Sequence, residues 1–270
     1  YEVGGNSLLD APLGPNFWRA TTDNDNAGWG DALDPWKEAA GRRTVTDIET
    51  GAHSVKIEAD LPVGDSRIVI TYAFLGNGAV HVEYDLYPVG TDIPVAIPKV
   101  GMQMQIPGNY STMSWFGRGP EESYADRKTG INLGTYSGQI DELWVDYPVP
   151  QENGNRTDVR WAAFTNEAGN GFIAVADEVI NVSAWPYTLN ELQDSDHMNQ
   201  LPRSDFYTVN LDLAQQGVGG TDTWSGHARA LEAYRLHTNQ SYHYGFSLIP
   251  YSSEMGKPGN MANFSFPEID

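Results

Sequence analysis

The sequence predicts an all-β protein in which antiparallel strands form two packed sheets. Apolar and polar residues alternate with a period of two along much of the 270 residues, a pattern typical of strands with one buried and one wet face. Gly and Pro are scattered through the connections, and helical signals are few. Because no linker-like run and no repeat of fixed period interrupts the pattern, we expect a single domain over residues 1–270.

Six segments carry the strand pattern most clearly. Residues 55–61 place four apolar side chains at alternate positions between three charged ones. Residues 68–74 and 80–86 repeat the alternation on either side of a Gly-Asn-Gly turn at 76–78, which predicts a hairpin. The other three segments with this alternation are 100–106, 207–213 and 242–248.

Helices are expected only as short excursions from the strands. One is predicted near residues 35–40, and another begins after Thr188, where Glu191 stands three residues on as in a capping box. Three long stretches, 10–36, 107–130 and 144–160, are interpreted as irregular. In a sheet protein such loops usually carry the function.

The composition excludes several classes of partner and site. Sixteen Lys and Arg against 36 Asp and Glu give a formal net charge of −20, which repels nucleic acid and anionic membrane surfaces. The chain has no Cys, so disulfides, thiolate metal sites and a cysteine nucleophile are excluded. No apolar run approaches the ~20 residues that span a bilayer. We therefore expect a soluble protein, for which cytoplasm and periplasm both stay open.

Two segments in the first half of the chain combine aromatic and polar residues with turn formers. Residues 13–25 read LGPNFWRATTDND, which offers carboxylates and an amide to a sugar or a cation; on composition alone, the acids would cap backbone N–H groups. Residues 115–128 read WFGRGPEESYADRK, in which two arginines and two adjacent glutamates favour structural ion pairs.

Two further segments follow. Residues 147–161 read YPVPQENGNRTDVRW, a Pro-rich entry with an Asn-Gly turn and a strand start, for which a structural loop is the default. Residues 214–225 read AQQGVGGTDTWS, a Gly-rich loop that matches no nucleotide-binding pattern. This loop presents Trp224, whose flat ring suits the apolar face of a pyranose.

These four segments resemble the C-terminal domain of glycoside hydrolase family 2 β-galactosidases, which two-subunit forms encode as a separate small chain. The family patterns NFWRAPTDND, GRGPHENYPDR and GVGGDDSW align with residues 16–25, 117–127 and 217–224, and their order and spacing agree over nearly the whole chain. Four positions depart from the family patterns, where Pro, His, Asn and Pro are usual: Thr21, Glu121, Ser123 and Ala125.

The resemblance implies a galactose-mutarotase-like supersandwich and places hydrolysis elsewhere. A retaining glycosidase needs two carboxyl groups ~5–5.5 Å apart, and in this family both are Glu residues of a central barrel domain that this sequence lacks. We therefore expect no catalytic residue, metal site or cofactor in this chain, and Mg²⁺ and Na⁺ in the absent barrel domain. The expected partners are the barrel and remaining domains and a galactoside substrate.

The resemblance also assigns site residues. Trp224 matches the family Trp that enters the active site and stacks on the substrate sugar. Residues 26–34 correspond to a loop that moves during the reaction, with hinge freedom from Gly28 and Gly30. Three polar residues are expected to support the base of this loop: Asp23, Asn24 and Asp25.

Two rival functions stay open. A stand-alone aldose 1-epimerase would need a His and Glu pair as acid and base; six His are present, and nothing around them resembles an epimerase motif. A carbohydrate-binding module is supported by the aromatic residues that such modules use for stacking.

Overall fold

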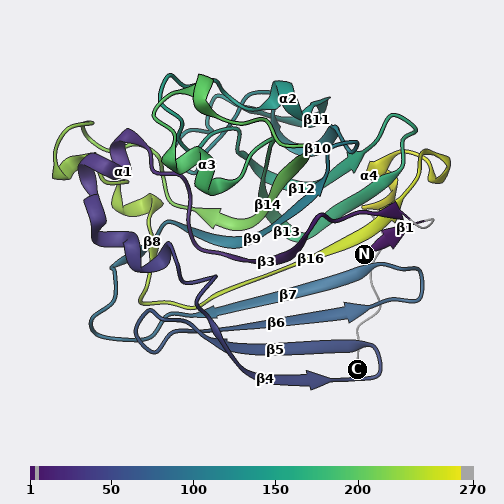
Figure 1. Cartoon of the computed structure of the whole chain (residues 1–270), viewed down its shortest axis with the longest axis horizontal. Helices are drawn as coiled ribbons and strands as arrows, with labels where there is room; N and C mark the ends of the chain where they lie inside the picture. The colour runs from purple at the N-terminus through teal and green to yellow at the C-terminus, as the bar shows by residue number, and fades with distance from the viewer. Residues whose placement is uncertain (4–5, 263–270) are drawn as a thin grey trace.

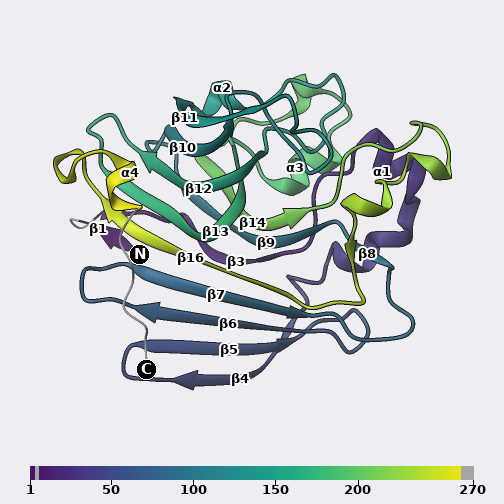
Figure 2. The same ribbon diagram turned by 180° about the vertical axis from the view of Figure 1, so that it is seen from behind.

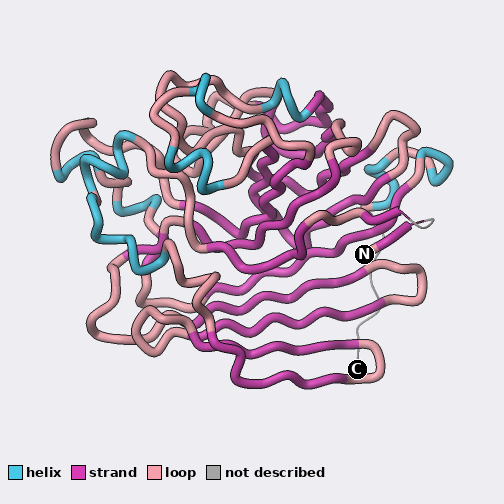
Figure 3. The backbone as a smooth tube through the Cα atoms, viewed as in Figure 1, coloured by secondary structure: helices cyan, strands magenta, loops and turns pink. Residues whose placement is uncertain are grey.

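The computed structural model describes residues 1–3 and 6–262 and consists mainly of antiparallel strands (Figures 1 and 3). In the described chain, twelve strands join in one main sheet. They are β3 (Ala11–Asn16), β4 (Thr44–Thr50), β5 (Ser54–Asp60), β6 (Arg67–Phe74), β7 (Val80–Tyr87), β9 (Lys99–Pro107), β10 (Thr112–Gly119), β11 (Asn132–Gln139), β12 (Arg156–Thr165), β13 (Gly171–Trp185), β14 (Phe206–Gln215) and β16 (Tyr242–Tyr251). The all-β prediction is confirmed.

The remaining elements are short. Two small pairs join β1 (Glu2–Val3) to β2 (Asn6–Ser7) and β8 (Ala96–Ile97) to β15 (Leu236–His237). The α-helices are α1 (Asp23–Gly28), α2 (Ile140–Leu143), α3 (Leu189–Asp194) and α4 (Pro258–Met261). The 3-10 turns are η1 (Gly30–Trp36), η2 (Met198–Gln200), η3 (Gly226–Ala228), η4 (Glu232–Tyr234) and η5 (Ser253–Met255). None of the described helices is long and apolar enough to cross a membrane.

The sheet branches at β13, the longest strand. One edge of β13 pairs with β12; the other pairs first with β16, from Gly171 to Ala176, and then with β14, from Asn181 to Trp185. One branch continues through β7, β6, β5 and β4, and the other through β9 and β3. The two predicted layers are thus branches of one curled sheet, with β4 to β7 facing the rest (Figures 1 and 2). Both branches contribute to the main core, for example Leu86, Met102 and Leu211.

The six predicted strands are all present. The hairpin of β6 and β7 pairs Phe74 with Val80 around the Gly-Asn-Gly turn. The capping box also forms, because the Thr188 hydroxyl accepts from the Glu191 N–H and the Glu191 carboxylate accepts from the Thr188 N–H. The helix expected near 35–40 instead lies earlier, as η1.

The interpretation of residues 10–36, 107–130 and 144–160 as irregular is wrong in part, because they contain β3, α1, β10 and the start of β12. β3 carries two prolines and pairs with β9 alone, and an edge strand tolerates proline since one side needs no ladder hydrogen bond. In β10 two of the four buried positions are glycines, Gly117 and Gly119. The strand therefore lacks the apolar alternation that would have predicted it.

Candidate functional site

A cleft of about 700 Å³ opens at the end of the molecule where α1 and the loop before β15 lie side by side (Figures 1 and 2). All four segments singled out in the sequence contribute to its walls. Examples from each segment in turn are Asp23, Tyr124, Tyr147 with Glu152, and Thr223. The fold therefore gathers these segments around one hollow.

The first wall is α1, which lies in the stretch 10–36 that was expected to be irregular. Thr22 caps the helix: its hydroxyl accepts from the Asp25 N–H at 3.1 Å, and the Asp25 carboxylate accepts from the Thr22 N–H at 3.1 Å. Asp25 also binds Arg19 through both oxygens, at 2.9 and 3.1 Å, and both side chains are buried. The capping role considered for these acids holds for Asp25, whereas Asp23 is exposed and lines the cleft.

Arg19 links α1 to the Gly-rich segment on the opposite side. Its guanidinium donates to the backbone carbonyls of Gln216 and Gly217, the latter at 2.9 Å, and to the Gln215 side chain at 3.2 Å. One buried fork thus satisfies two backbone carbonyls and a carboxylate, which suits the planar donor geometry of Arg.

The Gly-rich segment wraps around a carboxylate of the second segment. Asp126 accepts from the N–H groups of Val218 and Gly219 at 3.1 and 2.8 Å. A Cβ at Gly217 would lie 2.6 Å from the Asp126 carboxylate, so glycine is required for this approach.

Trp224 projects from the end of this segment and is 80% exposed, as expected for a loop residue. The backbone beneath it is ordered by Asp222, whose carboxylate accepts from the N–H groups of Trp224 and Ser225 at 3.3 and 3.1 Å and from the Ser225 hydroxyl at 2.7 Å. The Ser225 hydroxyl bond holds the pKa of Asp222 below its usual value. The loop therefore presents a large apolar ring on a fixed backbone.

The third segment, which lines the cleft with Tyr147 and Glu152, is held to the second segment by Glu122. This carboxylate pairs with Arg127, accepts from the Tyr147 hydroxyl and accepts from the Gly154 N–H at 2.7 Å. The predicted ion pairing of the second segment is thus confirmed for Arg127, whereas Arg118 pairs with Asp158 of β12.

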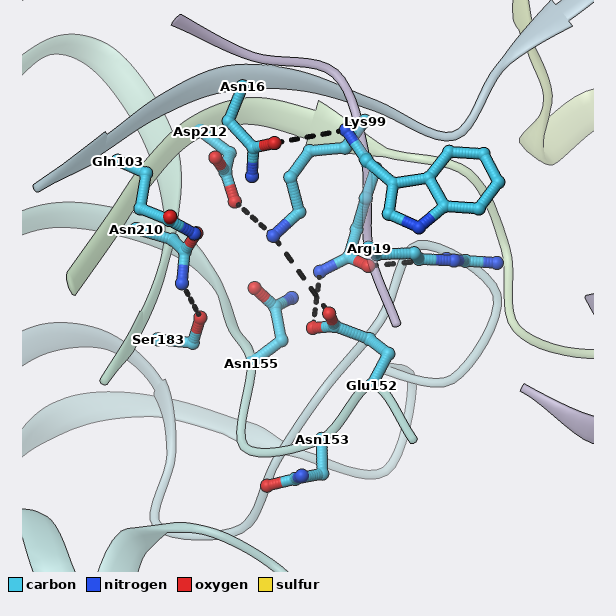
Figure 4. A network of polar contacts seen from close by, with 12 residues as sticks. Asn16, Arg19, Lys99, Gln103, Glu152, Asn153, Asn155, Ser183, Asn210 and Asp212 are labelled. Carbon is cyan, nitrogen blue, oxygen red and sulfur yellow. Dashed lines mark hydrogen bonds and ion pairs between the residues drawn. The ribbon is translucent and has the colours of Figure 1, made fainter. Parts of the chain in front are cut away.

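Polar side chains of the sheet lie beneath the cleft, where the sequence predicted a wet face. Lys99 of β9 is fully buried, with Nζ 3.2 Å from Asp212 Oδ2 and 3.9 Å from Glu152 Oε2 (Figure 4). Gln215 donates to the other Glu152 oxygen at 3.1 Å. Opposite Asp212 stands Gly101, where a Cβ would lie 2.0 Å from the carboxylate. The prediction of a solvated polar face is therefore wrong for β9 and β14.

This buried network continues along the sheet. Gln103 donates to Asn210 at 2.9 Å, and Asn210 donates to Ser183 at 3.1 Å, so three neighbouring strands are linked (Figure 4). Burial raises the pKa of Asp212 to about 7, and the nearby Lys99 ammonium opposes that rise. Nothing in the sequence marks these residues, because each occupies an ordinary polar position of an alternating strand.

The two glycines of the expected moving loop differ in their surroundings. Gly28 packs on the backbone at the end of η3, where a Cβ would lie 2.4 Å from the backbone nitrogen of Arg229. The Gly28 carbonyl also accepts from the Nε of the Arg229 side chain at 2.6 Å. Gly30 has a φ of +51° and nothing within 4 Å of a Cβ position. Movement of this loop stays a prediction.

No histidine side chain lines the cleft, although His227 belongs to the loop that carries Trp224. His243 is 2.9 Å from Asp85 and His81 is 2.9 Å from Ser247, both across the β7 and β16 pair. Among the described residues, no group of three or more His, Cys, Asp or Glu could hold a metal ion.

Comparison with known proteins decides the family. The chain matches the family described as beta galactosidase small chain over residues 1–248. It belongs to this family. The match covers the four segments around the cleft and all of the main sheet except the end of β16.

Relatives are much longer than this small-chain sequence. A β-galactosidase of Priestia megaterium is 36% identical over 93% of this chain, which spans 24% of that protein. A β-galactosidase of Halalkalibacterium halodurans is 31% identical over 92% of this chain and 25% of its own length. Among solved structures, an aldose epimerase homologue from C. elegans has a TM-score of 0.42 at 12% identity, covering 78% of this chain and 69% of that one.

Proposed function

We propose that this chain forms one wall of the sugar site of a β-galactosidase that hydrolyses terminal β-D-galactosides. The observation that carries the proposal is Trp224, 80% exposed on a loop whose backbone is held by Asp222. A large aromatic ring left in water on an ordered backbone suits stacking on a pyranose, because the ring face is apolar and the indole N–H stays wettable. The polar cleft beside it adds hydroxyl-binding side chains.

Hydrolysis itself is assigned to another part of the enzyme. The chain spans about a quarter of its curated relatives, and a retaining glycosidase needs two free carboxyl groups ~5–5.5 Å apart. Glu152, the glutamate that lines the cleft, is held by Lys99 and Gln215 and has no exposed side-chain surface. We infer that a barrel domain supplies both catalytic Glu residues, together with Mg²⁺ and Na⁺. The chain purified by itself should then release no nitrophenol from a nitrophenyl β-galactoside, and turnover would contradict this assignment.

Substitution of Trp224 tests the wall directly. In the intact enzyme, Trp224→Ala should weaken binding of a galactoside inhibitor by about tenfold, because ring stacking contributes ~0.5–1.5 kcal/mol beyond the buried area. The free energy of unfolding should change by less than about 0.5 kcal/mol, since the ring touches no core. Inhibitor titration and thermal melts measure the two effects. A large loss of stability with unchanged affinity would remove Trp224 from the site.

A further inference from the structure

The loop that carries Trp224 leaves and re-enters the fold at one narrow neck. Thr221 N–H donates to the His227 carbonyl at 2.8 Å, which closes the loop across its base. The carbonyls of Asp222 and Ala228 flank the same neck, and both accept from the Nδ2 of Asn24, each at 3.0 Å. One amide group therefore joins the two ends of the loop to each other and to α1.

We propose that Asn24 is a positioning residue for Trp224. The proposal rests on the sugar-binding role given to Trp224 above and names the side chain that fixes where the ring stands. The two N–H groups of one amide reach two carbonyl acceptors, whereas the reverse orientation would place the amide oxygen against two carbonyl oxygens. The geometry thus requires a donor of two hydrogen bonds at this position.

Asn24 can serve as a fixed point because its own helix is held from below. It follows Asp23 in the first turn of α1, between the Thr22 cap and Asp25, whose carboxylate is bound by buried Arg19. Arg19 also binds the carbonyls of Gln216 and Gly217, a few residues before the neck. The helix and the loop therefore share one buried anchor.

A second contact lies at the other end of α1. Arg229 follows the loop directly, donates to the Gly28 carbonyl at 2.6 Å and lies 4.7 Å from the Trp29 ring centroid. With Asn24 at its first turn and Gly28 at its last, α1 contacts both sides of the loop base. A displacement of residues 23–29 would consequently move Trp224 with them.

The test uses the intact β-galactosidase with Asn24→Ala and Asn24→Asp. Asp keeps the size of the side chain but replaces the NH2 group, which donates both hydrogen bonds, by a carboxylate oxygen. This oxygen can only accept and would face two carbonyl oxygens. Hydrogen exchange of the peptide covering residues 221–228 should become faster by about tenfold in both variants, as expected for the loss of two side-chain hydrogen bonds. KM should rise about three- to tenfold, while kcat changes less than about twofold, because Asn24 touches no reacting atom.

Asn166→Ala is the matched control. Asn166 also forms two hydrogen bonds with backbone groups, accepting from Ala168 and Asn170 N–H at 3.0 Å each, in the turn between β12 and β13. Its loss should leave exchange of residues 221–228 and KM unchanged. An equal effect of this distant change would overturn the specific role of Asn24.

A double variant separates this proposal from the proposed function. If Asn24 acts through Trp224, adding Asn24→Ala to Trp224→Ala should change KM no further. Wild-type exchange in Asn24→Asp would overturn the proposal for Asn24. Faster exchange with an unchanged KM would instead overturn the sugar-binding role of Trp224, on which the proposal rests.

Discussion

Strands β7 and β14 have the same alternation of apolar and polar residues but meet different surroundings. In β7, Val82 and Tyr84 are buried whereas Glu83 between them is exposed. In β14, Leu211 is buried on the core side and Asp212 is buried as well, beneath the cleft. Alternation therefore shows which face of a strand is apolar, and it leaves open what covers the polar face.

The covered polar face is costly and has to be compensated. Removing charged groups from water costs several kcal/mol each unless partners replace the solvent. Beneath the cleft the partners are other protein groups: Lys99 faces Asp212 and Glu152, and Arg19 faces Asp25. These contacts join strands, α1 and loops that are far apart in the sequence. Strands β4 to β7, the regular layer of the sheet, depend on apolar burial for their stability. The cleft end depends on this polar network.

Removal of one member of the network should give the largest loss. Arg19→Met would remove the cation that pairs with Asp25 and the donor to two backbone carbonyls, and breaking a buried pair costs about 3–5 kcal/mol. Arg67→Met in β6 is the matched control, because Arg67 is half exposed and its Glu58 partner lies 3.9 Å away; it should cost less than about 1 kcal/mol. Urea unfolding compares the two. Similar losses would mean that the cleft end is not more dependent on polar contacts than the layer.

Asp212 should make stability depend on pH. Burial raises its native pKa to about 7, whereas the pKa of an exposed Asp is about 3.9. Between these two pH values the native state therefore binds more protons than the unfolded state. The free energy of unfolding should therefore fall as pH rises from about 4 to about 7, by up to about 4 kcal/mol from this group. Asp212→Asn should remove that part of the slope, while Asp47→Asn on exposed β4 should not. Parallel pH profiles for wild type and Asp212→Asn would contradict this.

The sequence predicted the strands in which apolar and polar residues alternate, whether or not the polar face stays wet. It failed for α1, whose six residues are too few for a periodic pattern and whose capping box uses Asp25 in place of the usual Glu or Gln. For β12 it predicted only a strand start within residues 147–161, because this strand is largely buried on both faces and so lacks clear alternation. The four segments around the cleft were found from their composition and family resemblance. Lys99 and Asp212 were not, because their role depends on which segments cover them.

The smallest effect is expected at the free edge of the regular layer. Ile48, Ile57 and Ile70 lie opposite one another on β4, β5 and β6, so they share one row of the sheet. Ile70 is 5% exposed and Ile48 is 57% exposed, since the core ends before β4. Ile70→Ala should cost about 2–5 kcal/mol, as for other buried Ile residues. Ile48→Ala should cost at most about 1 kcal/mol, mainly through the weaker strand preference of Ala. Urea unfolding of both variants measures the difference that burial makes within one row. A cost at Ile48 as large as at Ile70 would show that another surface covers β4.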